Sequence, residues 1–179
     1  VGLSWALSGQ PGLAVTGLKR AMDMLPESAK GGLKGVLAGV YLSHEMEEES
    51  RALYQEVLKA NPQDPTALLG MARLALKDKD LTQAGNYLKR ARKAGARKAL
   101  VGFELARLFL AGNDVAKARI VLEELVDLHP RMLQAWGLLA EVLLLQNDEP
   151  ALRQCVEALE EVPGGSSVSG NPAAAASGN

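Results

Sequence analysis

The chain has 179 residues, of which 47% are hydrophobic, 23% charged and 4% aromatic, and its formal net charge is −1. This length fits one domain of ordinary size, and the near-neutral charge excludes a global field that would attract nucleic acid or anionic lipid. No apolar run reaches the roughly 20 residues of a membrane-spanning helix, so we expect no membrane insertion.

The apolar residues predict helices in pairs, beginning with a partial pair. Ala14, Leu18 and Ala21 have the spacing of a second helix near residues 11–25, and Trp5 belongs to a truncated first helix before it. Four complete pairs follow, with first helices expected near residues 31–43, 65–77, 98–111 and 132–146 and second helices near residues 46–60, 80–94, 114–128 and 148–161. From residue 163 the chain is rich in Gly, Ser and Ala and lacks the apolar bulk that would offset its ordering entropy.

Short turns are expected within and between the pairs. Asp80, Asp114 and Asp148 each stand just before a second helix, where a carboxylate can accept a hydrogen bond from a free backbone N–H. Gly95 and Gly112 follow helix ends, where a residue with a left-handed backbone is expected.

Equivalent residues recur every 34 positions when repeats start at Gly31, Pro65, Ala99 and Leu133. The eighth position is then Ala in all four repeats, at residues 38, 72, 106 and 140. A methyl group at this position lets two helices approach closely. One pair of short antiparallel helices cannot enclose a core, whereas stacked pairs bury a continuous one.

These residues resemble the tetratricopeptide pattern of Trp-x2-Leu-Gly-x2-Tyr, Ala-x3-Phe and a terminal Pro over about 34 residues. The third full repeat matches best, through Leu105, Ala106, Phe109, Ala118, Leu122 and Pro130. The resemblance implies an all-α fold, a right-handed superhelical solenoid of antiparallel helix pairs. We expect a helical repeat domain over residues 1–162, with a partial repeat at 1–28 and full repeats near 31–64, 65–98, 99–132 and 133–162, followed by a linker or tail at 163–179.

In this family the first helices line a concave groove, chiefly through positions 2, 5, 9 and 12 of each repeat. The resemblance therefore implies a peptide-binding groove lined by Leu69, Arg73, Leu76, Leu100, Phe103, Arg107, Leu110, Glu141 and Leu144. The leucines and Phe103 would form an apolar strip, and Arg73 and Arg107 could meet a carboxylate or backbone carbonyls. The alternative is that Arg107 pairs with Glu141.

One specialised role within the family is not expected. Its co-chaperone members grip a C-terminal carboxylate with Lys and Asn at fixed groove positions. The matching positions here carry Gly35, Gly39 and Arg73, with no Asn.

Catalytic chemistry is not expected. His44 and His129 lie on different repeats, neither has neighbours at metal-ligand spacing, and no phosphate-binding Gly loop follows a strand. We therefore expect neither an enzyme nor a cofactor nor a bound metal. The basic run at residues 89–98 has no interleaved aromatic residue for base stacking, so nucleic acid is not an expected partner.

The sequence predicts a protein–protein interaction scaffold that binds a peptide or helix in its groove. One alternative is a self-associating, homo-oligomeric assembly or spacer element of a larger bacterial envelope or secretion complex, because residues 138–145 are apolar on more than one face. Another is a non-catalytic accessory domain of an enzyme outside this fragment. The Gly- and Ala-rich composition suggests a bacterial protein, and the start at Val1 without a Met suggests a fragment of a longer one. The sequence leaves cytoplasm and periplasm both open.

Overall fold

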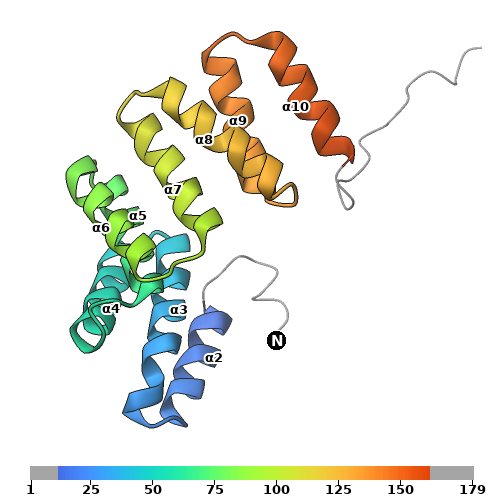
Figure 1. Cartoon of the computed structure of the whole chain (residues 1–179). Coiled ribbons are helices and arrows are strands. Elements are labelled where there is room, and N and C mark those ends of the chain that lie inside the picture. The colour runs from blue at the N-terminus through green and yellow to red at the C-terminus, as the bar shows by residue number, and fades with distance from the viewer. Residues whose placement is uncertain (1–11, 162–179) are drawn as a thin grey trace, which may run out of the picture. The chain divides into compact units, whose positions relative to one another are not determined.

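The computed structural model describes residues 12–161, apart from the side chains of residues 28, 160 and 161. In this range every regular element is a helix (Figure 1). The elements are α2 (Gly12–Asp23), the short 3-10 turn η1 (Glu27–Ala29), α3 (Lys30–Ser43), α4 (Glu47–Ala60), α5 (Pro65–Lys77), α6 (Leu81–Lys93), α7 (Lys98–Ala111), α8 (Val115–Leu128), α9 (Leu133–Leu145) and α10 (Glu149–Glu161). Each predicted helix in this range is confirmed, with ends within two residues of the expected ones. The truncated helix with Trp5 and the tail from residue 163 lie outside the described residues.

The chain divides between residues 121 and 122 into two compact units, of which the structure describes residues 12–121 and 122–161. In the first unit, α3 packs against α4 and α5 packs against α6, forming two antiparallel pairs. The first helices α3, α5 and α7 also contact each other in chain order, because each second helix returns the chain to the same side. In the second unit, α9 and α10 form a further pair.

The turn inside each pair has the same backbone geometry in all four repeats. The fifteenth residue adopts a left-handed conformation each time, with φ of 61° at Glu45, 61° at Lys79, 59° at Asn113 and 54° at Asn147. The next residue donates its backbone N–H to the carbonyl of the eleventh, as in Asp114 to Phe109 at 2.8 Å. This pattern is a Schellman motif, which satisfies carbonyls at the helix end.

The predicted capping aspartates are confirmed. The carboxylates of Asp80, Asp114 and Asp148 accept backbone N–H groups three residues later, at 2.9, 3.2 and 3.1 Å. The expectation for Gly112 was wrong, because its φ is −85° and the left-handed residue is the following Asn113. Gly95 does adopt the expected conformation, with φ of 83°.

Small residues bring the helices of the first unit together. Ala38, Ala72 and Ala106 are fully buried, whereas Ala140 of the second unit is partly buried. Gly70 allows the closest approach, because a Cβ there would lie 2.1 to 2.6 Å from three atoms of the Tyr54 ring. The α4 ring therefore packs directly on the α5 backbone, which ties one repeat to the next.

Candidate functional site

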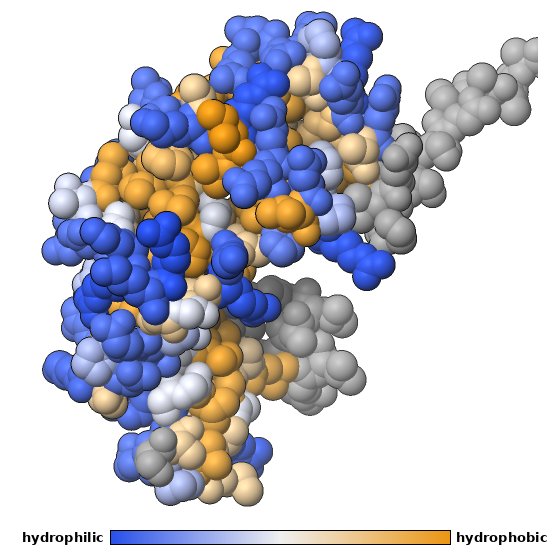
Figure 2. Space-filling model, viewed as in Figure 1, coloured by the Kyte–Doolittle hydropathy of each residue, from blue (hydrophilic) through white to orange (hydrophobic). Residues whose placement is uncertain are grey.

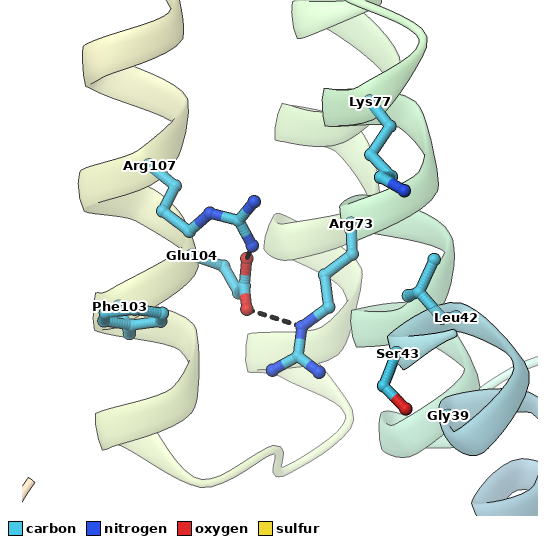
Figure 3. Close-up of a pocket in the computed structure, with 8 residues that line it drawn as sticks. All are labelled: Gly39, Leu42, Ser43, Arg73, Lys77, Phe103, Glu104 and Arg107. Carbon is cyan, nitrogen blue, oxygen red and sulfur yellow. Dashed lines mark hydrogen bonds and ion pairs between the residues drawn. The ribbon is translucent and has the colours of Figure 1, made fainter. Parts of the chain in front are cut away.

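A pocket of about 250 Å³ lies between the first helices of the first unit. Its lining comprises Gly39, Leu42 and Ser43 from α3, Arg73 and Lys77 from α5, and Phe103, Glu104 and Arg107 from α7 (Figure 3). All eight residues belong to first helices, which is where the sequence places the groove.

The carboxylate of Glu104 organises one wall of this pocket. Its side chain is 0% exposed, and each oxygen is taken by an arginine. The Arg73 Nε donates to Oε1 at 2.5 Å, and the Arg107 Nη1 donates to Oε2 at 3.2 Å. A buried charge is costly unless it is paired and hydrogen-bonded. The two guanidiniums supply that pairing, and their side chains remain 37% and 41% exposed.

Cations outnumber anions in the lining. The lining holds three cationic side chains, Arg73, Lys77 and Arg107, and the single carboxylate of Glu104. Lys77 also forms an ion pair of 2.6 Å with Glu47 from the start of α4, which is not part of the lining. The pocket is therefore suited to a negatively charged or carbonyl-rich ligand.

The remaining lining is apolar or small. Phe103 and Leu42 are partly buried and present hydrocarbon surface beside the charged groups. Gly39 leaves room on the α3 side, since a Cβ there would meet only the Tyr54 hydroxyl at 3.5 Å. Burial raises the pKa of that hydroxyl, while the positive charge of Arg73 opposes the rise. Tyr54 is therefore a neutral neighbour of the pocket.

The structure distributes the nine predicted groove residues unevenly. Arg73, Phe103 and Arg107 line the pocket together. Three further leucines are partly buried without lining it, namely Leu76, Leu100 and Leu110. Glu141 and Leu144 are exposed on α9 of the second unit.

The structure corrects the prediction that Leu69 lines the groove. It is 7% exposed and packs in a core cluster with Leu68, Ala72, Leu88, Ala91 and Val101. Helix α5 has neighbours on both sides, so its fifth repeat position is covered rather than open.

Five lining residues are absent from the predicted set of nine. Gly39 and Leu42 stand at the groove positions 9 and 12 of the first full repeat, whereas Ser43, Lys77 and Glu104 stand outside the groove positions. Ser43 and Lys77 occupy position 13, one helical turn beyond position 9, and Glu104 occupies position 6. One signal was present for Glu104, because it is the only acidic residue in α7, a largely apolar helix, and it stands three residues before Arg107.

Among residues 12–161, no group of three or more His, Cys, Asp or Glu side chains is placed to hold a metal ion. In the same range, no helix combines the length and apolar character needed to cross a bilayer.

Two family models, both described as tetratricopeptide repeat, match residues 42–103 and residues 103–164. The chain belongs to the tetratricopeptide repeat family. This family is typically a non-catalytic protein-interaction module. None of the curated proteins matches the chain significantly in sequence.

Solved structures share the tetratricopeptide fold. TTC0263, a thermophilic tetratricopeptide protein of Thermus thermophilus, is 19% identical, with a TM-score of 0.74 over 91% of this chain and 89% of that one. PilF of Pseudomonas aeruginosa is 17% identical, with a TM-score of 0.67 over 91% and 73%. YrrB, described as having an unusual peptide-binding site, is 13% identical, with a TM-score of 0.54 over 88% and 80%. At these identities the likeness establishes the fold class of stacked helix pairs alone.

Proposed function

We propose that this tetratricopeptide repeat chain is a protein-interaction scaffold that holds a peptide or helix of a partner protein against α3, α5 and α7. The observation that carries the proposal is the pocket among these first helices, where a buried carboxylate holds two guanidiniums at its rim. A solved relative of the same fold, YrrB, is described as having a peptide-binding site.

The pocket has the features that such binding needs. Glu104 restricts Arg73 and Arg107 before any ligand arrives, so less side-chain entropy is lost on binding. Phe103 and Leu42 offer apolar surface to a ligand side chain. Polar groups beside a small apolar surface give a ligand both orientation and affinity.

The test uses a peptide selected from a displayed random library for binding to the wild-type chain. We expect the double variant Phe103→Ala, Arg107→Glu to bind this peptide at least about tenfold more weakly, because it loses an apolar contact and reverses a charge. Arg92→Glu is the matched control, since Arg92 is exposed on α6 and does not line the pocket. Equal affinity of the double variant and the wild type would exclude the pocket as the site of peptide binding.

Self-association is a second candidate, and the surface of α9 favours it. Leu133, Leu144 and Leu145 are 52%, 60% and 66% exposed. Figure 2 shows apolar residues among hydrophilic ones on the visible face of the molecule. Light scattering across a concentration series tests this candidate. A larger mass that returns to the monomer in Leu144→Ser, Leu145→Ser supports it, and a monomer at every concentration refutes it.

A further inference from the structure

We propose that a second copy of this chain docks the acidic end of its helix α8 on the basic surface formed by residues 89–98. The contacting residues are Arg97 and Lys98 in one copy and Glu124 and Asp127 in the other. This inference rests on self-association, the second candidate function, and names the surfaces that meet. None of the four residues lines the peptide pocket.

The near-zero net charge of the chain is the sum of two opposite charges. The sequence of the first unit, up to residue 121, contains 18 Lys and Arg and 12 Asp and Glu, which gives +6. The sequence of the second unit contains 2 Lys and Arg and 9 Asp and Glu, which gives −7. Charges are screened beyond about 8 Å at physiological salt, so a docking surface responds to the nearby charge rather than to the net charge. The first unit of one copy is therefore expected to attract the second unit of another.

The excess positive charge of the first unit is confined to ten residues. Residues 89–98 contain six cations and no acid, while the rest of this unit holds 12 charges of each sign. They cover the end of α6, the connecting turn and the start of α7 (Figure 1). All six cationic side chains are exposed, and in the described part of the chain none of them forms an ion pair. They are Lys89, Arg90, Arg92, Lys93, Arg97 and Lys98.

Arg97 and Lys98 are placed against the dipole of their own helix. Arg97 stands at the N-cap of α7 without a side-chain hydrogen bond, and Lys98 is the first residue of that helix. The N-terminus of a helix carries partial positive charge, which favours a carboxylate and disfavours a cation. Helices α5 and α6 follow this rule, because Asp64 and Asp80 accept backbone N–H groups there. The stability of α7 does not explain its two cations, whereas an anionic surface bound to them would.

The second unit offers complementary anions at the opposite kind of helix end. Glu124 and Asp127 are exposed, share one face near the C-terminus of α8, and form no ion pair with any residue in the range 12–161. A helix C-terminus disfavours negative charge, so these carboxylates also stand against their dipole. Leu128, on the same face, is 66% exposed and adds apolar surface.

A second copy is the occupant that accounts for both surfaces. An anionic bilayer or a nucleic acid would neutralise the cations of residues 89–98 and leave Glu124 and Asp127 without a partner. A second copy instead brings the two sets of charges together and covers Leu128. Complementary charges of this kind increase the rate of association and select the surfaces that meet.

The experiment measures the mass of the full chain by sedimentation equilibrium across a concentration series. One variant, Arg97→Glu, Lys98→Glu, reverses the basic surface, and another, Glu124→Lys, Asp127→Lys, reverses the acidic one. In both variants the new charges match the helix dipoles. Their urea unfolding midpoints should therefore equal or exceed that of the wild type, which separates loss of association from loss of folding.

We expect each reversal to weaken self-association by about tenfold or more, because like charges then face each other. An equimolar mixture of the two variants should associate within about threefold of the wild type, since each reversed surface meets its complement. Raising the salt concentration from about 0.05 M to about 0.5 M should weaken wild-type association by about tenfold, because the screening length shortens. The matched control Lys19→Glu, Arg20→Glu reverses two exposed cations on α2 and should associate as the wild type does.

The outcomes separate this inference from the functions proposed above. Association that survives both reversals but is lost in Leu144→Ser, Leu145→Ser would overturn this inference and leave self-association standing. A monomeric wild type at every concentration would overturn both. A monomeric wild type that binds phosphatidylglycerol vesicles, with binding lost in Arg97→Glu, Lys98→Glu, would assign the basic surface to a membrane and also overturn the inference. Peptide binding in the pocket is unaffected by these outcomes, because both reversal variants keep its lining.

Discussion

Gly70 stands in the middle of α5, where the Tyr54 ring fills the space that a side chain would occupy. In Gly70→Ala the new Cβ would lie 2.1 to 2.6 Å from three ring atoms, whereas carbon atoms in contact are normally about 3.5 to 4.0 Å apart. The ring is 2% exposed and packs among Ala38, Val57, Ala67, Met71 and Leu74, so it has little room to retreat. Overpacking of this kind costs up to about 3 kcal/mol. The higher helix propensity of Ala offsets about 1 kcal/mol of this cost, so we expect Gly70→Ala to lower the free energy of unfolding by about 2 kcal/mol.

Gly39→Ala, on the neighbouring first helix α3, should have the opposite effect on stability. Its Cβ would meet only the Tyr54 hydroxyl, at an ordinary 3.5 Å, so the gain in helix propensity should stabilise the chain by about 0.5 to 1 kcal/mol. Urea unfolding followed by circular dichroism measures both changes. In a Tyr54→Leu background, Gly70→Ala should lose most of its cost, since the obstructing ring is gone.

A shift of the unfolding midpoint in the same direction for Gly70→Ala and Gly39→Ala would contradict a clash with the Tyr54 ring as the cause. An equal cost of Gly70→Ala in the Tyr54→Leu background and in the wild type would also contradict it, because the cost would then not come from the ring.

Three further predictions concern stability and use the same unfolding measurement. Leu88→Ala should lower the free energy of unfolding by about 2 to 5 kcal/mol because Leu88 is 1% exposed. Ile120→Ala should change it by less than about 0.5 kcal/mol because Ile120 is 64% exposed. Equal effects of the two variants would contradict the assignment of the core. Glu104→Ala should cost about 1 to 3 kcal/mol by removing the acceptor that joins α5 and α7, and Glu104→Gln, which keeps one acceptor, should cost less. A larger cost for Gln than for Ala would contradict the role of the acceptor oxygens. Lys79→Gly should stabilise the chain by up to about 1 kcal/mol because φ at Lys79 is 61°. Asp80→Ala should destabilise the chain by about 1 kcal/mol because the cap of α6 is lost. Destabilisation by both variants would argue against the turn geometry.

The helices were predictable because the same sequence features recur from repeat to repeat. An Ala at position 8 and apolar residues on one face recur at 34-residue spacing in all four full repeats, and an Asp precedes the second helix in three of them, so the repeats support one another's assignment. The left-handed residue was misplaced at Gly112 because glycine is the usual choice there. The chain instead uses position 15, where Glu45 and Lys79 accept the strained backbone without being glycine.

The site was less predictable because its contacts join distant residues. Arg73 and Glu104 lie 31 positions apart, and only the stacking of α5 on α7 brings them together. Assigning groove residues by their position in the repeat also treats every repeat as equivalent. Helix α5, however, packs against a first helix on each side, α3 and α7. This is why Leu69 is in the core and Arg73, four residues further on, reaches the pocket.

The position at which a selected peptide binds shows whether the first helices form the binding surface. Backbone amide shifts measured by NMR during titration of the labelled chain with that peptide report its position residue by residue. We expect the largest changes on the first helices, at Gly39, Ser43 and Lys77, with little change on α4 and α6. Changes confined to α4 and α6, with the first helices unaffected, would contradict it.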